Sequence, residues 1–193
     1  MGVVLISGTP GTGKTTLASG LARRLGYEFI DIGKLAEAEH IYLRIDARRN
    51  TKIIDEKRLA KRLEKEVRAT HGNIVMASHY AEIVNPKLVD KVIVLRTRPE
   101  ELRRRLLQRG WSVSKIGENL EAEIVGVCSS NALSRFGSHR TYEIDTTRLQ
   151  PDQVLRIALE IFESKDESHT AGSIDWLAEL EKEDKLGMYM REG

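Results

Sequence analysis

Residues 8–15 read GTPGTGKT, from Gly8 to Thr15, and match the pattern G-x-x-x-x-G-K-[ST]. An apolar run at 3–7 precedes them and a helical pattern follows. Glycines in such a loop let backbone N–H groups curl around phosphate oxygens, and the next helix points its positive end at them. The stretch therefore predicts a site for a nucleoside triphosphate with magnesium. Lys14 is expected to reach the β- and γ-phosphates, and the Thr15 hydroxyl is expected to hold Mg²⁺.

The rest of the chain alternates short β-branched runs with longer amphipathic stretches, which favours an α/β fold with a parallel sheet. Nearly continuous apolar runs are typical of strands that helices cover on both faces. Asp55 is placed to cap a helix that runs through Arg68, and Pro99 and Pro151 stand at first helical positions. Residues 114–133 are predicted to form one longer helix. Five strands are predicted, at 3–7, 27–31, 73–77, 91–95 and 141–145.

Composition excludes several classes of protein. The chain has 193 residues, which suggests one domain, and its 31 basic residues nearly balance 29 acidic ones, which excludes a histone-like polycation. The single cysteine, Cys128, excludes a disulfide framework and a multi-cysteine zinc site. No apolar run approaches the roughly 18 residues of a membrane helix, and the N-terminus lacks the features of a signal peptide. We expect a cytoplasmic protein without membrane or stable DNA binding.

Two segments interrupt the simple alternation. Residues 32–54 are a long insertion after a strand, and such insertions are often binding lids. After Glu163 the composition changes to that of a linker with a short amphipathic piece, and residues 163–193 hold nine acidic and four basic residues, a net charge of −5. Residues 44–68 hold ten basic and five acidic residues, a net charge of +5. We interpret that basic stretch mainly as a solvated helix.

Arginines concentrate between Arg96 and Arg109, with six of them against two glutamates. Guanidinium groups suit a migrating phosphoryl group, whose charge is spread over three oxygens. Arg109 is favoured for this role because it ends a predicted helix just before Gly110 and Trp111. Most of the others, the run 103–105 above all, are interpreted as a solvated helix face.

Three further residues fall at the ends of predicted strands, where ligands of open α/β sheets gather. His79 follows the third strand and is expected either to orient a water or a phosphate or to be a hydrogen-bonded structural residue. Asp31 ends the second strand and is expected either to bind a metal-bound water or to cap the next helix turn. Ala77 occupies the strand end where many such proteins place an aspartate.

The order of blocks resembles one family. GTPGTGKTTLA, YEFIDIGKLA, IIDEKRL, VLRTRPEELRRRLLQRGW and ENLEAEI are similar to the small atypical adenylate kinases, of the adenylate kinase isoenzyme 6 type and its archaeal relatives. The similarity extends from about residue 2 to 130 and, more weakly, through Phe162. The arginine–glycine–tryptophan sequence at 109–111 makes the match specific.

The resemblance implies a doubly wound P-loop fold like that of the nucleoside monophosphate kinases, with a five-stranded parallel sheet and helices on both faces. A domain at 1–163 would carry a monophosphate-binding insertion at about 31–54 and a lid at about 108–118, followed by a linker and acidic tail at 164–193. Members transfer a phosphoryl group between ATP and AMP or related monophosphates and also hydrolyse ATP. The residues implied to contact ATP are Gly11, Gly13, Lys14, Thr15, Thr16 and Arg109.

The family also implies a role in maturation of the small ribosomal subunit, through a platform ribosomal protein and the pre-ribosomal particle. Two departures bear on the activity: Ala77 replaces an acid common in the family, and Glu37 stands where the insertion usually offers an arginine. We expect Lys14 and Arg109 to stabilise the transferring phosphoryl, His79 to be a secondary catalytic candidate, and Asp31 and Arg44 to border the acceptor site. An ATPase switch in ribosome assembly, with little kinase activity, and a non-catalytic ATP-binding scaffold are the alternatives.

Overall fold

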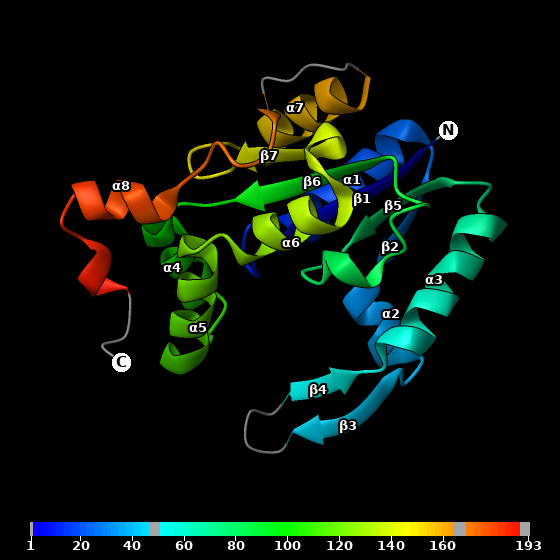
Figure 1. Cartoon of the computed structure of the whole chain (residues 1–193), viewed down its shortest axis with the longest axis horizontal. Helices are drawn as coiled ribbons and strands as arrows, with labels where there is room; N and C mark the ends of the chain where they lie inside the picture. Colours follow the sequence, from blue (N-terminus) through cyan, green and yellow to red (C-terminus); the bar gives the residue numbers. More distant parts are fainter. Residues whose placement is uncertain (1, 47–50, 164–168, 190–193) are drawn as a thin grey trace.

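A five-stranded parallel sheet, in the order β2-β5-β1-β6-β7, forms the centre of the computed structural model, which describes residues 2–46, 51–163 and 169–189 (Figure 1). The predicted parallel sheet is confirmed, and each strand bound agrees with its prediction to within one residue. The strands are β1 (Gly2–Gly8), β2 (Glu28–Asp31), β5 (Asn73–Ala77), β6 (Lys91–Arg96) and β7 (Thr141–Asp145).

Helices cover both faces of this sheet, as the apolar strands require. On β1, Val3 and Leu5 pack toward α2 (Ile32–Ala38), α3 (Glu56–Ala69) and α6 (Val127–Phe136). Val4 and Ile6 point the opposite way, toward α1 (Lys14–Leu25) and α7 (Pro151–Glu163). Successive side chains of a strand alternate between faces, so every central strand contributes to both cores.

The insertion after β2 consists of α2 and an antiparallel hairpin, β3 (Tyr42–Asp46) and β4 (Thr51–Ile54). Figure 1 shows the hairpin extending away from the sheet, beside α2 and the start of α3. Ile41 is buried and Ile54 partly so, and both belong to the core cluster beneath α3. The base of the insertion is thus anchored to the core while its hairpin projects outward.

A second, smaller core lies where α4 (Pro99–Gln108), α5 (Val113–Ile124) and α8 (Trp176–Lys182) meet. Leu102, Leu120 and Leu180 are among its fully buried members. Residues 169–189 pack here and along β7, and the domain boundary at 163/164 stays a prediction. Short 3₁₀ turns occupy Ala81–Ile83, Ser138–Arg140 and Leu186–Met188. No helix within the described residues is long and apolar enough to cross a membrane.

The prediction of one helix over 114–133 is wrong. The chain breaks at Gly126, whose φ of 68° is left-handed, so that α5 ends at Ile124 and α6 begins at Val127. This turn lets α6 pack on the sheet while α5 packs against α4. A β-carbon at Gly126 would lie 3.6 Å from Nη1 of Arg96. The predicted N-cap at Asp55 is confirmed, and Pro99 and Pro151 are the first residues of their helices, as predicted.

Replacing Gly126 by alanine is expected to lower the free energy of unfolding by about 1–2 kcal/mol, because an L-residue strains in the left-handed region. Urea unfolding at constant m-value measures this loss. Gly126→Asn is the matched control and should cost less, since asparagine tolerates that conformation. Equal losses for the two variants would contradict the assignment of the cost to backbone strain.

Candidate active site

The P-loop (residues 8–15) joins β1 to α1 and turns tightly across the end of β6. A β-carbon at Gly8, where φ is 135°, would lie 2.4 Å from the backbone oxygen of Leu95. Gly13 has a φ of 106° and caps α1, which begins at Lys14. Gly8 must be glycine because a side chain there would collide with the backbone of Leu95. Gly13 must be glycine because its positive φ disfavours other residues. The loop aims the N-terminus of α1 at the carboxyl edge of the sheet.

Lys14 is held inside this loop. Its Nζ donates a hydrogen bond to the carbonyl oxygen of Thr9 at 3.0 Å. Burial, with a smaller contribution from the positive charge of Arg109, lowers the pKa of Lys14 to about 8, although Glu123 and Asp31 act in the opposite direction. The structure thus brings Arg109, an exposed residue at the end of α4, within electrostatic reach of Lys14. A bound polyanion would relieve both unfavourable effects.

Thr15 and Asp31 meet at the same edge. The Thr15 hydroxyl donates to Oδ2 of Asp31 at 3.1 Å, and Oδ1 of Asp31 accepts from the Lys34 amide at 3.2 Å. Asp31 therefore caps α2, as one of its two predicted roles required. It also lies in register beside Ala77 on the neighbouring strand, so a carboxylate is present one strand away from the position of the family's acid.

The oxygens of Thr15 and Asp31 fit Mg²⁺, a hard cation that keeps several waters and takes few protein ligands. Thr15 would ligate the ion directly, and Asp31 would hold one of its waters. No three His, Cys, Asp or Glu side chains gather into a metal cage in the portion of the chain that the structure describes. A metal held mainly by nucleotide phosphates and water is compatible with that donor set.

His79 lies just past β5, opposite Lys14. Burial, and then the charge of Lys14, lower the pKa of His79 to about 4. Its ring is 3.8 Å from that of Tyr80, and its carbonyl oxygen accepts a weak contact from Sγ of Cys128 at 3.8 Å. His79 is accordingly a neutral hydrogen-bonding group near pH 7 rather than a cation.

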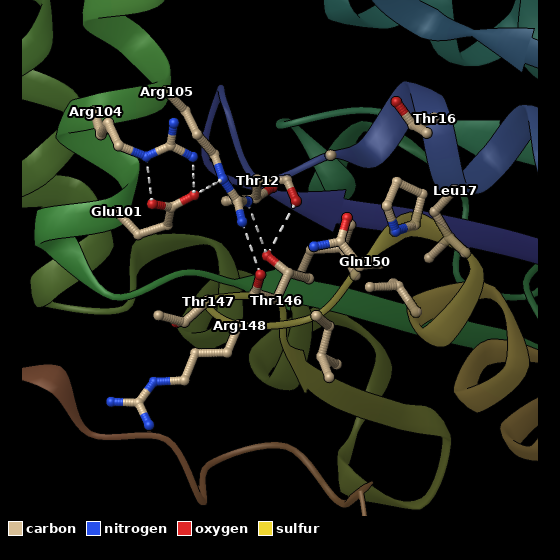
Figure 2. Close-up of a pocket in the computed structure, with 15 residues that line it drawn as sticks. Thr12, Thr16, Leu17, Glu101, Arg104, Arg105, Thr146, Thr147, Arg148 and Gln150 are labelled. Atoms are coloured by element: carbon tan, nitrogen blue, oxygen red, sulfur yellow. Dashed lines mark hydrogen bonds and ion pairs between the residues drawn. The ribbon is translucent and has the colours of Figure 1, made fainter.

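A cavity of about 450 Å³ opens on one side of the P-loop (Figure 2). Thr12, Gly13 and Thr16 form its P-loop wall, and the loop after β7 forms the wall opposite. Arg104 and Arg105 line it and share the carboxylate of Glu101, with 2.7 Å from each arginine to Oε1. A flat guanidinium beside an open cavity is a surface on which an aromatic base can stack.

Arg105 departs from the predicted solvated face. It is half-buried, and its Nη2 donates to the carbonyl oxygen of Thr146 at 2.8 Å, whereas Arg103 and Arg104 are exposed. The interpretation as a solvated face is therefore wrong for Arg105. The sequence contains a signal for the position of Arg105, because Glu101 lies four residues before it and opposite charges at this spacing pair on a helix.

Two further cavities, of about 370 and 360 Å³, lie on the other side of the P-loop. They share His79, Tyr80 and Lys115 as lining residues, and the second of them reaches Thr9 and Pro10 of the P-loop. The first is enclosed by α2 and the hairpin, through Ile32, Ala36, Glu37, Tyr42 and Lys52.

Charged side chains of the insertion meet inside the first of these cavities. Lys52 Nζ lies 2.6 Å from Oε1 of Glu37, and this hydrogen bond lowers the pKa of the Glu37 carboxyl. Arg44 is exposed on β3 and is not among the lining residues found in the described ranges, so its acceptor role stays a prediction. Sequence reasoning missed Lys52 and Lys115, because neither stands in a motif and only the hairpin and α5 bring them to His79.

The affinity for ATP is expected to fall about tenfold between pH 7 and pH 9. Lys14, with a pKa of about 8 in the free protein, loses its positive charge over this range and with it the attraction for phosphate. Titration calorimetry at a series of pH values measures the change. His79→Gln should leave this alkaline limb where it is, because His79 is already neutral; an affinity independent of pH up to 9 would contradict the role of Lys14.

The comparisons with known proteins agree with one another on the family and the fold of this chain. Residues 4–126 match the family model described as AAA domain. Proteins named "Putative adenylate kinase" are 35% identical over 180 residues in Thermococcus onnurineus and 34% over 173 in Methanocaldococcus jannaschii. The first match covers 93% of this chain and 94% of the relative, and the second covers 90% and 92%.

Solved structures extend the likeness in fold. Shikimate kinase from Bacteroides thetaiotaomicron superposes with a TM-score of 0.57 at 18% identity, over 84% of this chain and 98% of that one. A gluconokinase from Sinorhizobium meliloti gives the same TM-score and identity, over 84% and 91%. At this identity the likeness concerns the fold alone.

Proposed function

The chain belongs to the family of these archaeal proteins named putative adenylate kinase, and from this premise we propose that it transfers the γ-phosphoryl group of ATP to a nucleoside monophosphate, with AMP as the first candidate. The carrying observation is that the P-loop lines one cavity through Thr12 and Gly13 and a second through Thr9 and Pro10, and that the second shares His79 with a third. A hydrolase needs one nucleotide pocket and a water, whereas a kinase needs a second pocket that faces the γ-phosphate. This arrangement supports a donor site and an acceptor site.

The donor nucleotide is assigned to the cavity beside Arg104 and Arg105. Its base would lie against the arginines and the loop after β7, and its phosphates would follow the backbone of residues 11–16. Thr16 lines this cavity at the start of α1, which supports its proposed contact with ATP. Thr15 and Asp31 would hold Mg²⁺, which screens the charge of the phosphates when it is bound with ATP.

The acceptor is assigned to the cavities that meet at His79. Lys115, from the first turn of α5, and Lys52, from the hairpin, bring positive charge to this side. Lys52 is close enough to Glu37 to neutralise it, which removes the repulsion that an unpaired Glu37 would exert on a monophosphate. Ile32, Ala36 and Leu59 offer an apolar surface for the base.

In the proposed reaction, an oxygen of the acceptor phosphate attacks the γ-phosphorus while the bond from that phosphorus to the β–γ bridging oxygen breaks. ADP leaves with that electron pair, and the acceptor becomes a diphosphate. Lys14 and Arg109 stabilise the charge on the transferring group, and neutral His79 orients it by hydrogen bonding. Closure of the segment at 108–118, which comprises the turn after α4 and the start of α5, would exclude water, so that the acceptor is phosphorylated in preference to hydrolysis.

The decisive assay follows ADP formation from ATP·Mg²⁺ with and without a panel of monophosphates. AMP is expected to raise ADP output sharply, with two ADP formed for each AMP consumed. Lys14→Ala should lower the rate by about 10²–10³-fold, as loss of one transition-state charge contact does. A slow rate of ADP formation that no monophosphate increases would overturn the kinase proposal.

The pair formed by Lys52 and Glu37 predicts a selective effect on the acceptor. Lys52→Ala is expected to raise the KM for AMP several-fold while the KM for ATP stays the same, because the Glu37 carboxylate then faces the acceptor phosphate unpaired. Glu37→Gln in the same chain should reverse the loss. Steady-state kinetics with each substrate varied in turn measures both effects.

Lys57→Ala is the matched control, since Lys57 is an exposed cation on α3 outside the lining of the cavity. An equal rise in KM for AMP in this variant would assign the effect to net charge instead. A rise in the KM for ATP with Lys52→Ala would place Lys52 on the donor side.

ATP hydrolysis that serves maturation of the small ribosomal subunit is the second function we propose. The buried Ala77 leaves the end of β5 without the acid common in the family, which argues for weak phosphoryl transfer and so for a slow ATPase cycle as the alternative. The same assay separates the two functions: hydrolysis without an acceptor effect, together with co-purification of a platform ribosomal protein, would support the switch.

A further inference from the structure

A cluster of buried charges lies behind the P-loop, outside the cavities described above. Arg96 Nε lies 2.9 Å from Oε1 of Glu123, and Arg96 Nη1 lies 3.1 Å from Oε1 of Glu143. All three side chains are at most 3% exposed. One positive charge therefore faces two negative ones without water. Such a cluster is stable only if further hydrogen bonds satisfy the carboxylates.

The C-terminal segment (residues 169–182) supplies several of these bonds. Trp176 Nε1 donates to Oε1 of Glu123 at 3.2 Å. The amides of Gly172 and Ile174 donate to Oε2 of Glu143 at 2.9 and 3.3 Å, and the carbonyl oxygen of Ile174 accepts from Arg96 at 3.1 Å. The segment thus docks onto buried charge, not merely onto an apolar surface.

The second oxygen of Glu123 faces the P-loop. The Thr9 hydroxyl, on a residue that is 2% exposed, donates to Oε2 of Glu123 at 2.5 Å. The carbonyl oxygen of Thr9 in turn accepts from Nζ of Lys14 at 3.0 Å and from the Thr12 hydroxyl at 2.9 Å. A single carboxylate therefore links Trp176 of the C-terminal segment to the residue that holds Lys14.

We propose that Glu123 is a positioning residue that couples docking of the C-terminal segment to nucleotide binding in the P-loop. With Trp176 docked, Oε1 of Glu123 accepts from the indole in addition to Arg96 and the Thr97 amide, while Oε2 accepts from Thr9. Undocking removes one donor from Glu123 and two from Glu143, so the buried negative charge is less well compensated and the Glu123 carboxylate shifts relative to Thr9. By reciprocity, nucleotide binding stabilises the docked segment to the same extent.

This coupling goes beyond phosphoryl transfer and rests only on nucleotide binding, so it is tested with ADP·Mg²⁺ and no acceptor. Two variants of the full chain each remove one link. Trp176→Phe keeps a ring but removes the indole donor, and Thr9→Val keeps the shape but removes the hydroxyl. Each is expected to weaken ADP binding about three- to tenfold by calorimetry. The double variant should bind ADP with the same affinity as the single variant that binds it less tightly, because both substitutions interrupt the same chain of contacts.

Losses that multiply in the double variant would overturn the proposal, because independent sites show additive free energies. Thr9→Ser should restore the affinity, as it returns the hydroxyl. Glu179→Gln is the matched control on the same segment. It removes the negative charge 3.2 Å from Arg98 at an exposed rim, leaves the buried cluster intact, and should leave ADP affinity unchanged. A loss in this variant equal to that of Trp176→Phe would contradict the route through Glu123.

Hydrogen exchange supplies a readout in the unaltered protein. Saturating ADP is expected to slow hydrogen exchange of the Gly172 and Ile174 amides. The factor should be about the same as the factor by which Trp176→Phe weakens ADP binding. In Thr9→Val, ADP should not slow the exchange of these amides. Equal protection in both proteins, or none in the unaltered one, would overturn the coupling. Failure to bind ADP at all would overturn both this inference and the proposed donor site, whereas ADP binding without transfer to any monophosphate would overturn the kinase proposal alone.

Discussion

The close approach of Gly8 to the backbone of Leu95 is the constraint on which the site depends. With no side chain at Gly8, β1 and β6 stay paired to their ends and the P-loop turns across the edge of the sheet. That turn starts α1 at Lys14 and leaves open space on either side of the loop. The three cavities around the loop follow from this geometry, since α4 and the loop after β7 border one side and α2, His79 and α5 border the other.

Burial determines the electrostatic character of the site around the P-loop. Burial lowers the pKa of Lys14 from its ordinary value of 10.5 to about 8, so the surroundings of this side chain disfavour the ammonium by about 3 kcal/mol. A triphosphate replaces the water that Lys14 has lost, so this unfavourable free energy is released on binding. His79, whose pKa of about 4 has a similar cause, adds no competing charge near neutral pH. The site is thus organised for an anion before one arrives.

The local sequence pattern was sufficient for the sheet, for the strand–loop–helix geometry around Lys14 and Thr15, and for the Asp31 cap, because each lies at a fixed offset from a strand end. It was insufficient for Lys52, Lys115 and Arg105, which reach their cavities through the hairpin, α5 and α4. No periodicity in the sequence encodes the distance between elements far apart along the chain. The break at Gly126 had a visible signal, a glycine in a helical pattern, but glycine is also tolerated inside helices.

The acidic C-terminal segment shows why composition alone misleads. Residues 163–193 carry a net charge of −5, which is typical of a solvated tail, yet Trp176 and Leu180 within them are buried. Arg98, just before α4, contacts both Glu179 and Glu183, so part of this negative charge is neutralised within the fold. These rim pairs are partly exposed, and such pairs contribute little to stability. Docking of the segment must therefore depend mainly on its buried side chains and on the donors it gives to Glu123 and Glu143, which are the same contacts that reach the P-loop.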